Sequence, residues 1–306
     1  MSVPAAAQAP VNYRVAFPAP EHHYAAIEVT FSGVPNGTLE TRMSRSSPGR
    51  YALHEFSKNV FELKAFDGTG KELPVTRPNP SQRDVAKHDG TVRVVYKIYG
   101  DHVDGTYLGI DPTHAHMNMP AALLWARGLE GRSVRVIFEP PKGSSWVVAT
   151  QLFPTDSAWT FTAPNLQYLM DSPTELSAQT IRTFTVRGGD GKDATVRVAI
   201  HHDGGDREAN EYVAGAEKIV REHGAVFGEF PQFEPGYYTF LATYAQGANG
   251  DGMEHRNSTV LTAPAALARA VQLRRRQRVL GTVGRRRLHA VLRHAHHGPR
   301  RPRHAR

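Results

Sequence analysis

The sequence predicts a mainly β protein, with an N-terminal β-sandwich over residues 12–172 and an α+β region over residues 173–263. Three observations support this prediction. Short strand-like segments recur with glycine- and proline-rich turns between them. A clear helical pattern occurs only in the second region, and the basic residues crowd into the last part of the chain. A flexible leader is expected at 1–11 and a basic low-complexity tail at 264–306.

Six segments of the first region are rich in Val, Ile, Phe, Tyr and Thr, and several alternate apolar and polar residues as half-buried strands do. They are residues 13–17, 24–31, 59–66, 91–99, 134–138 and 159–162. Turns are expected between them at 35–37, 67–70, 89–90 and 130–131, where Gly, Asn and Asp accept the backbone angles of tight turns. Only Pro120–Arg127 has a short helical pattern, so a sandwich is favoured.

The second region begins with a hairpin pattern, in which residues 180–186 and 195–202 flank Gly188-Gly-Asp-Gly-Lys192. A helix is predicted from Asn210 to Phe227, because apolar residues recur there at helical spacing and Gly228 follows. Further strands are expected at 237–244 and 253–262, on either side of a glycine-rich loop at 247–252.

The net charge of +8 is concentrated at one end of the chain. Residues 264–306 hold 13 arginines and no Asp, Glu or Lys, so the rest keeps 24 of the 37 basic and all 29 acidic residues, a net of −5. Blocks of like charge with few apolar residues stay solvated, so this tail is expected to be disordered. Nucleic acid is expected to contact it only non-specifically, through phosphates, because no aromatic residues are interleaved.

Composition also excludes several classes of protein. The absence of cysteine excludes disulfides, thiolate metal sites and a thiol nucleophile, so any metal must be held by His, Asp or Glu. No run reaches the roughly 18 apolar residues of a membrane helix, so no membrane partner is expected. Residues 1–10 lack the basic and apolar parts of a complete secretory signal, which leaves the compartment open between a bacterial-type cytoplasm and periplasm.

Several motifs, in order along the chain, resemble the glycyl aminopeptidases, metallopeptidase family 61. They are Tyr13-Arg-Val-Ala-Phe-Pro-Ala-Pro-Glu-His-His-Tyr24, Met43-Ser-Arg-Ser-Ser-Pro-Gly-Arg-Tyr51, Phe56-Ser-Lys-Asn-Val60, Ala65-Phe-Asp-Gly-Thr-Gly70, Asp171-Ser-Pro-Thr-Glu175 and Gly252-Met-Glu-His-Arg-Asn-Ser-Thr259. The resemblance covers about residues 12–262. It implies a sandwich followed by the start of a thermolysin-like catalytic domain, with zinc as the family's cofactor and peptides with small N-terminal residues as substrates.

The chain departs from this family in two places. Ser44, Arg45 and Ser46 replace a Pro-x-Trp that many relatives carry, a change expected to alter packing in the sandwich. More seriously, no H-E-x-x-H occurs, although that motif supplies two zinc ligands and the general base in such enzymes. His54-Glu55 begins correctly but lacks the second His.

The family's zinc helix is expected soon after Val279-Leu-Gly-Thr-Val283, where this chain instead turns to Arg, His, Ala, Pro and Gly. Reading a GC-rich gene out of frame would give such a composition. His289 and His294 are five residues apart and do not share a helix face, so they are not expected to form a site. The chain is therefore expected to be a catalytically inactive fragment, with no catalytic residue, no metal ligand and no zinc bound specifically.

By the same resemblance, Gly252, Met253, Glu254 and His255 are the expected substrate-binding residues. A carboxylate on a strand that faces a cleft would pair with the free α-amino group of a peptide, and the strand edge would bind the peptide backbone. The alternative for Glu254 is a surface salt bridge to Arg256. The opposing hypothesis for the whole chain is a non-catalytic β-sandwich module that binds a peptide or a partner; the oligomeric state stays open.

The remaining histidines and tryptophans are interpreted as structural. His114 and His116 have the spacing that places two side chains on one side of a strand, but two histidines without a third ligand are a weak metal signal, and a polar loop is the favoured alternative. His22 and His23 are expected at a strand start. Trp125, Trp146 and Trp159 are expected in the core and at the rim of the sandwich.

Overall fold

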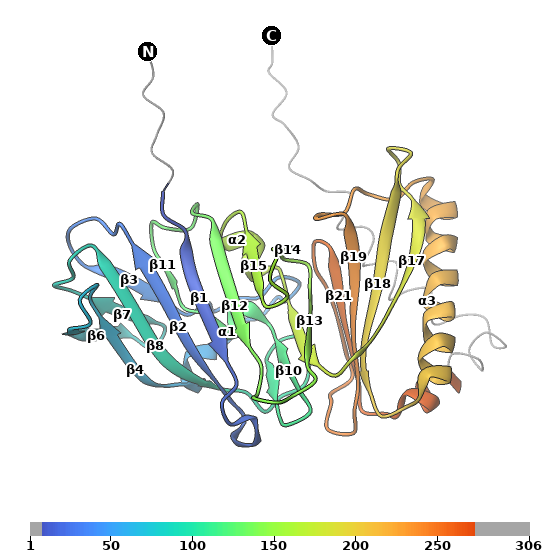
Figure 1. The fold of residues 1–306 in the computed structure, drawn as a ribbon, viewed down its shortest axis with the longest axis horizontal. Coiled ribbons are helices and arrows are strands. Elements are labelled where there is room, and N and C mark those ends of the chain that lie inside the picture. Colours follow the sequence, from blue (N-terminus) through green and yellow to red (C-terminus); the bar gives the residue numbers. More distant parts are fainter. Residues whose placement is uncertain (1–7, 273–306) are drawn as a thin grey trace, which may run out of the picture. The chain divides into compact units, whose positions relative to one another are not determined.

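A computed structural model describes residues 8–272. The chain is mainly β, as predicted, and it divides into two compact units. Unit 1 ends at Ala178 and unit 2 begins at Gln179. Figure 1 shows the strands of unit 1 in blue to green and those of unit 2 in yellow to orange.

The largest sheet of unit 1 has eight strands in the order β14-β15-β12-β1-β2-β8-β4-β5. Their bounds are β1 Val11–Ala16, β2 Tyr24–Ser32, β4 Val60–Phe66, β5 Glu72–Leu73, β8 Thr91–Tyr99, β12 Val134–Glu139, β14 Phe153–Pro154 and β15 Thr160–Ala163. The pairing of β1 with β12 is parallel, and the other pairings in this sheet are antiparallel.

Two four-stranded sheets complete unit 1, in the orders β13-β16-β10-β9 and β11-β3-β7-β6. Their strands are β3 Leu39–Arg42, β6 Val75–Asn79, β7 Gln82–Val85, β9 Leu108–Ile110, β10 His114–Met117, β11 Trp125–Ala126, β13 Val147–Thr150 and β16 Thr174–Ser177. The short helices are η1 Pro20–His22, η2 Phe56–Asn59, α1 Met119–Ala122 and α2 Leu166–Met170.

Alternation along the long strands explains the core of unit 1. Every second residue of β2, from Ala25 to Phe31, is buried, and β8 repeats this pattern from Val92 to Ile98. Because the two strands pair in register, their buried residues lie on one face. Residues of the smaller sheets, such as Leu39 and Met117, belong to the same cluster, so the sheets enclose one hydrophobic core. Trp146 is buried in this core, and Trp125 and Trp159 pack against it, as predicted.

Unit 2 contains one five-stranded sheet in the order β17-β18-β19-β21-β20. The bounds are β17 Thr180–Arg187, β18 Asp193–His202, β19 Tyr237–Tyr244, β20 Asp251–Glu254 and β21 Ser258–Ala263. Helix α3, Asp206–Phe227, connects the parallel strands β18 and β19. Figure 1 shows it along one face of the sheet, where its buried Tyr212, Val213 and Val220 join Phe240 in a second core.

Local signals set both ends of α3. At its start, the backbone N–H of Gly205 donates to the carboxylate of Glu208 at 3.2 Å, and the acidic residues Asp206 and Glu208 lie in the first turn, where the helix dipole favours them. At its end, Gly228 adopts φ 85°, which glycine accepts without steric cost. The predicted helix is thus confirmed, but it starts at Asp206, four residues earlier than expected.

The helical pattern predicted at Pro120–Arg127 is wrong after its first turn. Helix α1 ends at Ala122, and the chain then extends so that Trp125 pairs with Arg42 of β3. A buried tyrosine stabilises this extended segment, because the hydroxyl of Tyr96 donates to the carbonyl of Ala122 at 2.9 Å. Tertiary pairing here overrides a local preference.

Three further expectations need correction. The single strand expected at 253–262 is two strands, β20 and β21, joined by a turn. The division between units follows Ala178, six residues after the expected boundary at 172/173, because β16 pairs with β10 and β13 of unit 1. Residues 264–272, assigned to the basic tail, include Leu267 and Val271, which are buried in the second core. The rest of the tail lies outside the described residues.

Among residues 8–272, no helix is long and apolar enough to cross a membrane.

Candidate functional site

The four residues expected to bind substrate lie on β20 and directly after it. This strand is at the edge of the sheet of unit 2, where β21 is its neighbour in an antiparallel pairing. Glu254 lies opposite Thr259, and Met253 lies opposite Val260. Within the described residues no strand pairs with the outer side of β20, so its backbone groups there are not used by the sheet.

The residues of this strand alternate between the interior and the surface. Met253 is buried, whereas Gly252 is exposed and Glu254 is half-buried. The backbone N–H of Gly252 donates to the Asp251 carboxylate at 2.8 Å. The turn then closes where the N–H of His255 donates to the carbonyl of Ser258 at 2.9 Å, with His255 itself buried. The turn residues hold β20 against β21 and leave the side chain of Glu254 partly accessible.

Glu254 forms no salt bridge or hydrogen bond with a side chain of residues 8–272. The alternative expected from sequence, a surface pair with Arg256, is not formed; Nε of Arg256 lies 3.6 Å from Oε2 of Glu234 instead. An acidic side chain without a cation beside an open strand edge can do two things chemically. The edge can pair with an extended peptide, and the carboxylate can accept charge-assisted hydrogen bonds from an ammonium group.

The described residues do not fit a zinc ion. Nowhere in residues 8–272 do three or more His, Asp or Glu side chains gather in a way that could hold a metal. The partial motif His54-Glu55 lies in unit 1, where the His54 ring stacks on Phe56 at 5.0 Å and Glu55 is exposed. With no H-E-x-x-H in the 306 residues, no reaction step through zinc is derived for this chain. His289 and His294 lie outside the described residues.

A second group of titratable residues lies in unit 1, on the sheet that contains β10. His114 and His116 lie on this strand, as their spacing predicts, but they are buried in a sheet and the favoured polar loop was wrong. His116 is opposite Glu175 of β16, with Nδ1 3.3 Å from Oε2 and both side chains 1% exposed. The sequence motif Asp171-Ser-Pro-Thr-Glu175 contained this acid, but nothing in the sequence linked it to a histidine about 60 positions earlier.

The surroundings of His114 favour its protonated form. Burial alone would lower its pKa, but the hydrogen bond to Asp111 and the negative charges of Glu175 and Asp111 outweigh burial, so the pKa is raised. Burial likewise opposes ionisation of Asp111, yet His114 and the side chain and backbone of Thr113 hold its pKa well below the ordinary value. The pair is a structural ion pair with Nδ1 and Oδ1 3.4 Å apart.

His22 ends η1 and His23 precedes β2, as expected for residues at a strand start. The His23 ring nitrogen Nδ1 lies 2.6 Å from the carbonyl oxygen of Ile110. This contact ties the start of β2 to the end of β9.

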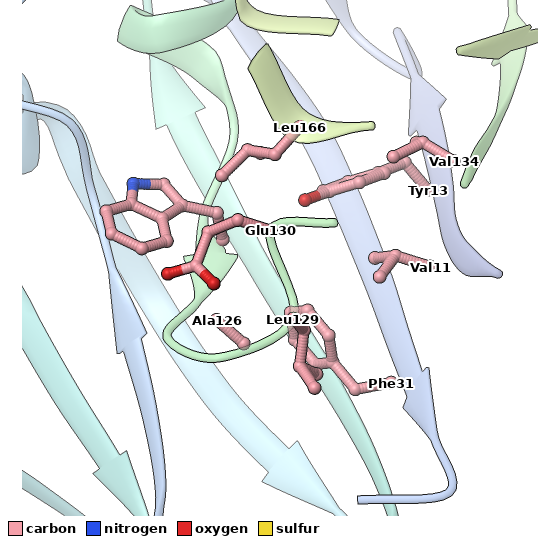
Figure 2. A pocket seen from close by; sticks show the side chains of 9 residues that line it. Val11, Tyr13, Phe31, Ala126, Leu129, Glu130, Val134 and Leu166 are labelled. Carbon is pink, nitrogen blue, oxygen red and sulfur yellow. The ribbon is translucent and has the colours of Figure 1, made fainter. Parts of the chain in front are cut away.

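An apolar hollow lies in unit 1. Figure 2 shows its lining, which includes Val11, Tyr13, Phe31 and Leu166. Its volume is about 10 Å³, which is the space of a single water molecule. This hollow therefore cannot hold a peptide side chain.

Comparison with known proteins identifies the family of the chain. A family model described as the Peptidase M61 N-terminal domain matches residues 12–178, more than half of the chain. No curated protein matches.

Among solved structures, the chain is similar to an aminopeptidase N family protein from Idiomarina loihiensis, with 23% identity and a TM-score of 0.71; the match covers 83% of this chain and 42% of that one. Weaker matches include an M1 zinc metallopeptidase from Deinococcus radiodurans, at 13% identity and TM-score 0.45 over 85% of this chain and 61% of that one. Leukotriene A4 hydrolase from Saccharomyces cerevisiae matches at 13% identity and TM-score 0.49, over 84% and 40%. At 23% identity the likeness to the first structure is one of fold, and the chain spans less than half of that structure.

Proposed function

The chain belongs to the family of the Peptidase M61 N-terminal domain, and on that premise we propose that it binds peptides by their free amino terminus without hydrolysing them. Its fold is metallo-aminopeptidase-like. The preference for a small first residue, glycine or alanine, is carried over from the resemblance to the glycyl aminopeptidases. The absence of H-E-x-x-H from the 306 residues supports the proposed inactivity, since metal-activated water supplies the nucleophile in such enzymes.

One observation carries the proposal: Glu254 is a half-buried carboxylate on an edge strand, and no side chain of residues 8–272 pairs with it. An extended peptide that adds to β20 would form backbone hydrogen bonds along the strand. Its α-ammonium group would then compensate the charge of Glu254, and a charge-assisted hydrogen bond of this kind contributes about 1.5–3 kcal/mol. Gly252 has no side chain to obstruct an approaching backbone.

Calorimetric titration of the full chain with Gly-Ala-Ala amide tests the binding. We expect Glu254→Gln to weaken binding about tenfold or more, and acetylation of the peptide's amino terminus to weaken it similarly. Glu234→Gln is the matched control, because Glu234 is also partly exposed on unit 2 but lies beside Arg256. Equal binding by the wild-type protein and Glu254→Gln would refute the role of Glu254.

The second half of the proposal concerns catalysis and is tested separately. After dialysis against a metal-free buffer, we expect no stoichiometric zinc by mass spectrometry and no release of nitroaniline from glycyl p-nitroanilide. One zinc per chain together with turnover would overturn the inactivity and leave the binding proposal standing.

A further inference from the structure

The loop between β3 and η2, residues 44–55, presents the two most exposed large apolar side chains of the described residues. Tyr51 is 98% exposed and Leu53 is 72% exposed. They are separated by one residue, Ala52, which is exposed as well. Single exposed apolar residues are common on protein surfaces. Two large apolar side chains that are both highly exposed on one loop are typical of a contact surface.

Hydrogen bonds hold the backbone of this loop, although the side chains at its tip are exposed. The N–H of His54 donates to the carbonyl of Arg45 at 2.8 Å, which closes the loop at its base. The buried hydroxyl of Ser47 accepts a hydrogen bond from Asn118 Nδ2 at 3.0 Å. A loop held in this way has already lost most of its conformational entropy, so a ligand that binds it does not have to order it.

A ring cluster supports the loop from below. The His54 ring stacks on the fully buried Phe56, with ring centroids 5.0 Å apart, and Tyr107 meets both rings edge-on at 5.8 and 5.4 Å. His54 follows Leu53 directly in the chain. The exposed pair therefore extends from a packed aromatic base.

The loop is basic on an otherwise acidic body. Arg45, Arg50 and Lys58 lie in or just after it, against the single acid Glu55, whereas residues 1–263 carry a net charge of −5. Arg45 and Lys58 are exposed and have no ion-pair partner among the described residues. Burial and the charge of Arg50 lower the pKa of His54, and the negative charge of Asp104 opposes them in part.

The chain differs here from the relatives it resembles. Ser44, Arg45 and Ser46 replace Pro-x-Trp, and the structure leaves Arg45 and Ser46 exposed and Ser44 half-buried. The expected change in sandwich packing stays a prediction. In this chain the segment places the cationic side chain of Arg45 on the surface of the loop.

We propose that the Tyr51–Leu53 loop is a docking site for acidic peptides that carry aromatic or aliphatic side chains. Tyr51 and Leu53 supply apolar contact area, and the guanidinium of Arg45 can bind a carboxylate through two parallel hydrogen bonds. The proposal rests on the proposed function only in taking the ligand to be a peptide. It requires neither an amino terminus nor Glu254.

The test uses the full chain and a peptide whose amino terminus is blocked, acetyl-Glu-Phe-Glu-Leu-Glu with a C-terminal fluorophore, followed by fluorescence anisotropy. We expect saturable binding that Tyr51→Ser/Leu53→Ser weakens at least tenfold and that Arg45→Glu also weakens. Glu254→Gln is expected to leave it unchanged, which separates this site from the proposed amino-terminus site. The lysine analogue acetyl-Lys-Phe-Lys-Leu-Lys should bind at least tenfold more weakly.

Val226→Ser is the matched control, because Val226 is 67% exposed but lies on α3 of unit 2. All substituted side chains of the loop are exposed, so the thermal midpoint should stay within about 2 °C of the wild type. Binding that survives Tyr51→Ser/Leu53→Ser would overturn the proposal. A second result would also overturn it: the protein sediments with phosphatidylserine vesicles, the same variant abolishes this sedimentation, and no peptide binds. The loop would then be a lipid contact. A dimer that this variant dissociates, again without peptide binding, would assign the loop to self-association instead.

Discussion

The two units close their hydrophobic cores in different ways. Unit 1 surrounds its core with three sheets, so its core does not depend on a single element to shield it from water. Unit 2 has one sheet, and within the described residues α3 is the only long helix that packs on it. From this comparison we expect unit 1 to have the larger free energy of unfolding. Unit 2 combines a sheet covered by one long helix with the open edge on which Glu254 lies.

Phe138→Ala would make the largest change in unit 1. Phe138 is 1% exposed on β12 and meets Phe161 edge-on at 6.0 Å, so truncation leaves a cavity that the surrounding sheets cannot close. We expect a loss of about 3–5 kcal/mol in the free energy of unfolding, measured by denaturant titration. Phe138→Leu is the control and should cost clearly less. A loss below about 1 kcal/mol for the alanine variant would contradict the idea of a tightly packed core in this unit.

Ala216→Pro tests the reliance of unit 2 on α3. Ala216 is buried in the middle of the helix, where proline removes a hydrogen bond and clashes with the preceding turn, at a cost of about 3 kcal/mol. Hydrogen exchange read by mass spectrometry should show faster exchange in β18 and β19 and unchanged exchange in β2 and β8. Faster exchange in both units to the same extent would mean that they unfold as one, and the comparison would fail. Ala214→Gly, a milder change on the same helix, should cost about 1 kcal/mol.

Asp111→Asn probes the ion pair in unit 1, with an expected loss of about 1 kcal/mol because Asp111 is itself 35% exposed. The raised pKa of His114 means that its contribution is complete below about pH 6.5 and is lost as the pH rises through the folded-state value. The lowered pKa of Asp111 means that its contribution is present above about pH 4 and is lost as the pH falls further.

Thermal midpoints of the wild type and Asp111→Asn should therefore differ most between about pH 4.5 and 6 and converge at alkaline pH. Thr113→Val is a useful companion, because it removes one hydrogen bond to Asp111 and keeps the charge. A difference that does not depend on pH would show that the effect of Asp111→Asn is not ionic.

Arg14→Gln is expected to have the smallest effect. Arg14 pairs with Glu139 across β1 and β12, but its side chain is 54% exposed, and surface ion pairs contribute less than about 1 kcal/mol. We expect the thermal midpoint to change by no more than a few degrees, and by less at high salt. This result would show that the core, and not this surface ion pair, supplies most of the stability of unit 1.

The long strands and α3 could be predicted because each has a local pattern with one buried face. β2 and β8 alternate along nine residues each, and α3 repeats its apolar residues over 22 residues. β10 and β16 could not be predicted. They have four residues each and are buried throughout. Thr174-Glu-Leu-Ser177 does not alternate, and His114-Ala-His-Met117 alternates over too few residues to separate a strand from a polar loop.

For the candidate site, the sequence placed Glu254 on a strand through a resemblance, but it could not show that this strand lies at the edge of its sheet. Edge position depends on the order of all five strands, and no local signal reports that order. The partner of Arg256 was missed for a similar reason, because Glu234 lies far away in the sequence. The exposure of Tyr51 and Leu53 likewise became visible only in the folded loop.

The parallel pairing of β1 with β12 has a consequence for synthesis on the ribosome. Val11 pairs with Val134, so β1 must wait for a partner that is made 123 residues later. At about 5–20 residues per second, this interval lasts roughly 6–25 s. During that time β1 can pair only with β2, and its other edge stays open to neighbouring nascent chains. A chaperone that holds β1 early, or a slower stretch of translation after β12, would protect the folding of unit 1 without changing a single contact of its final structure.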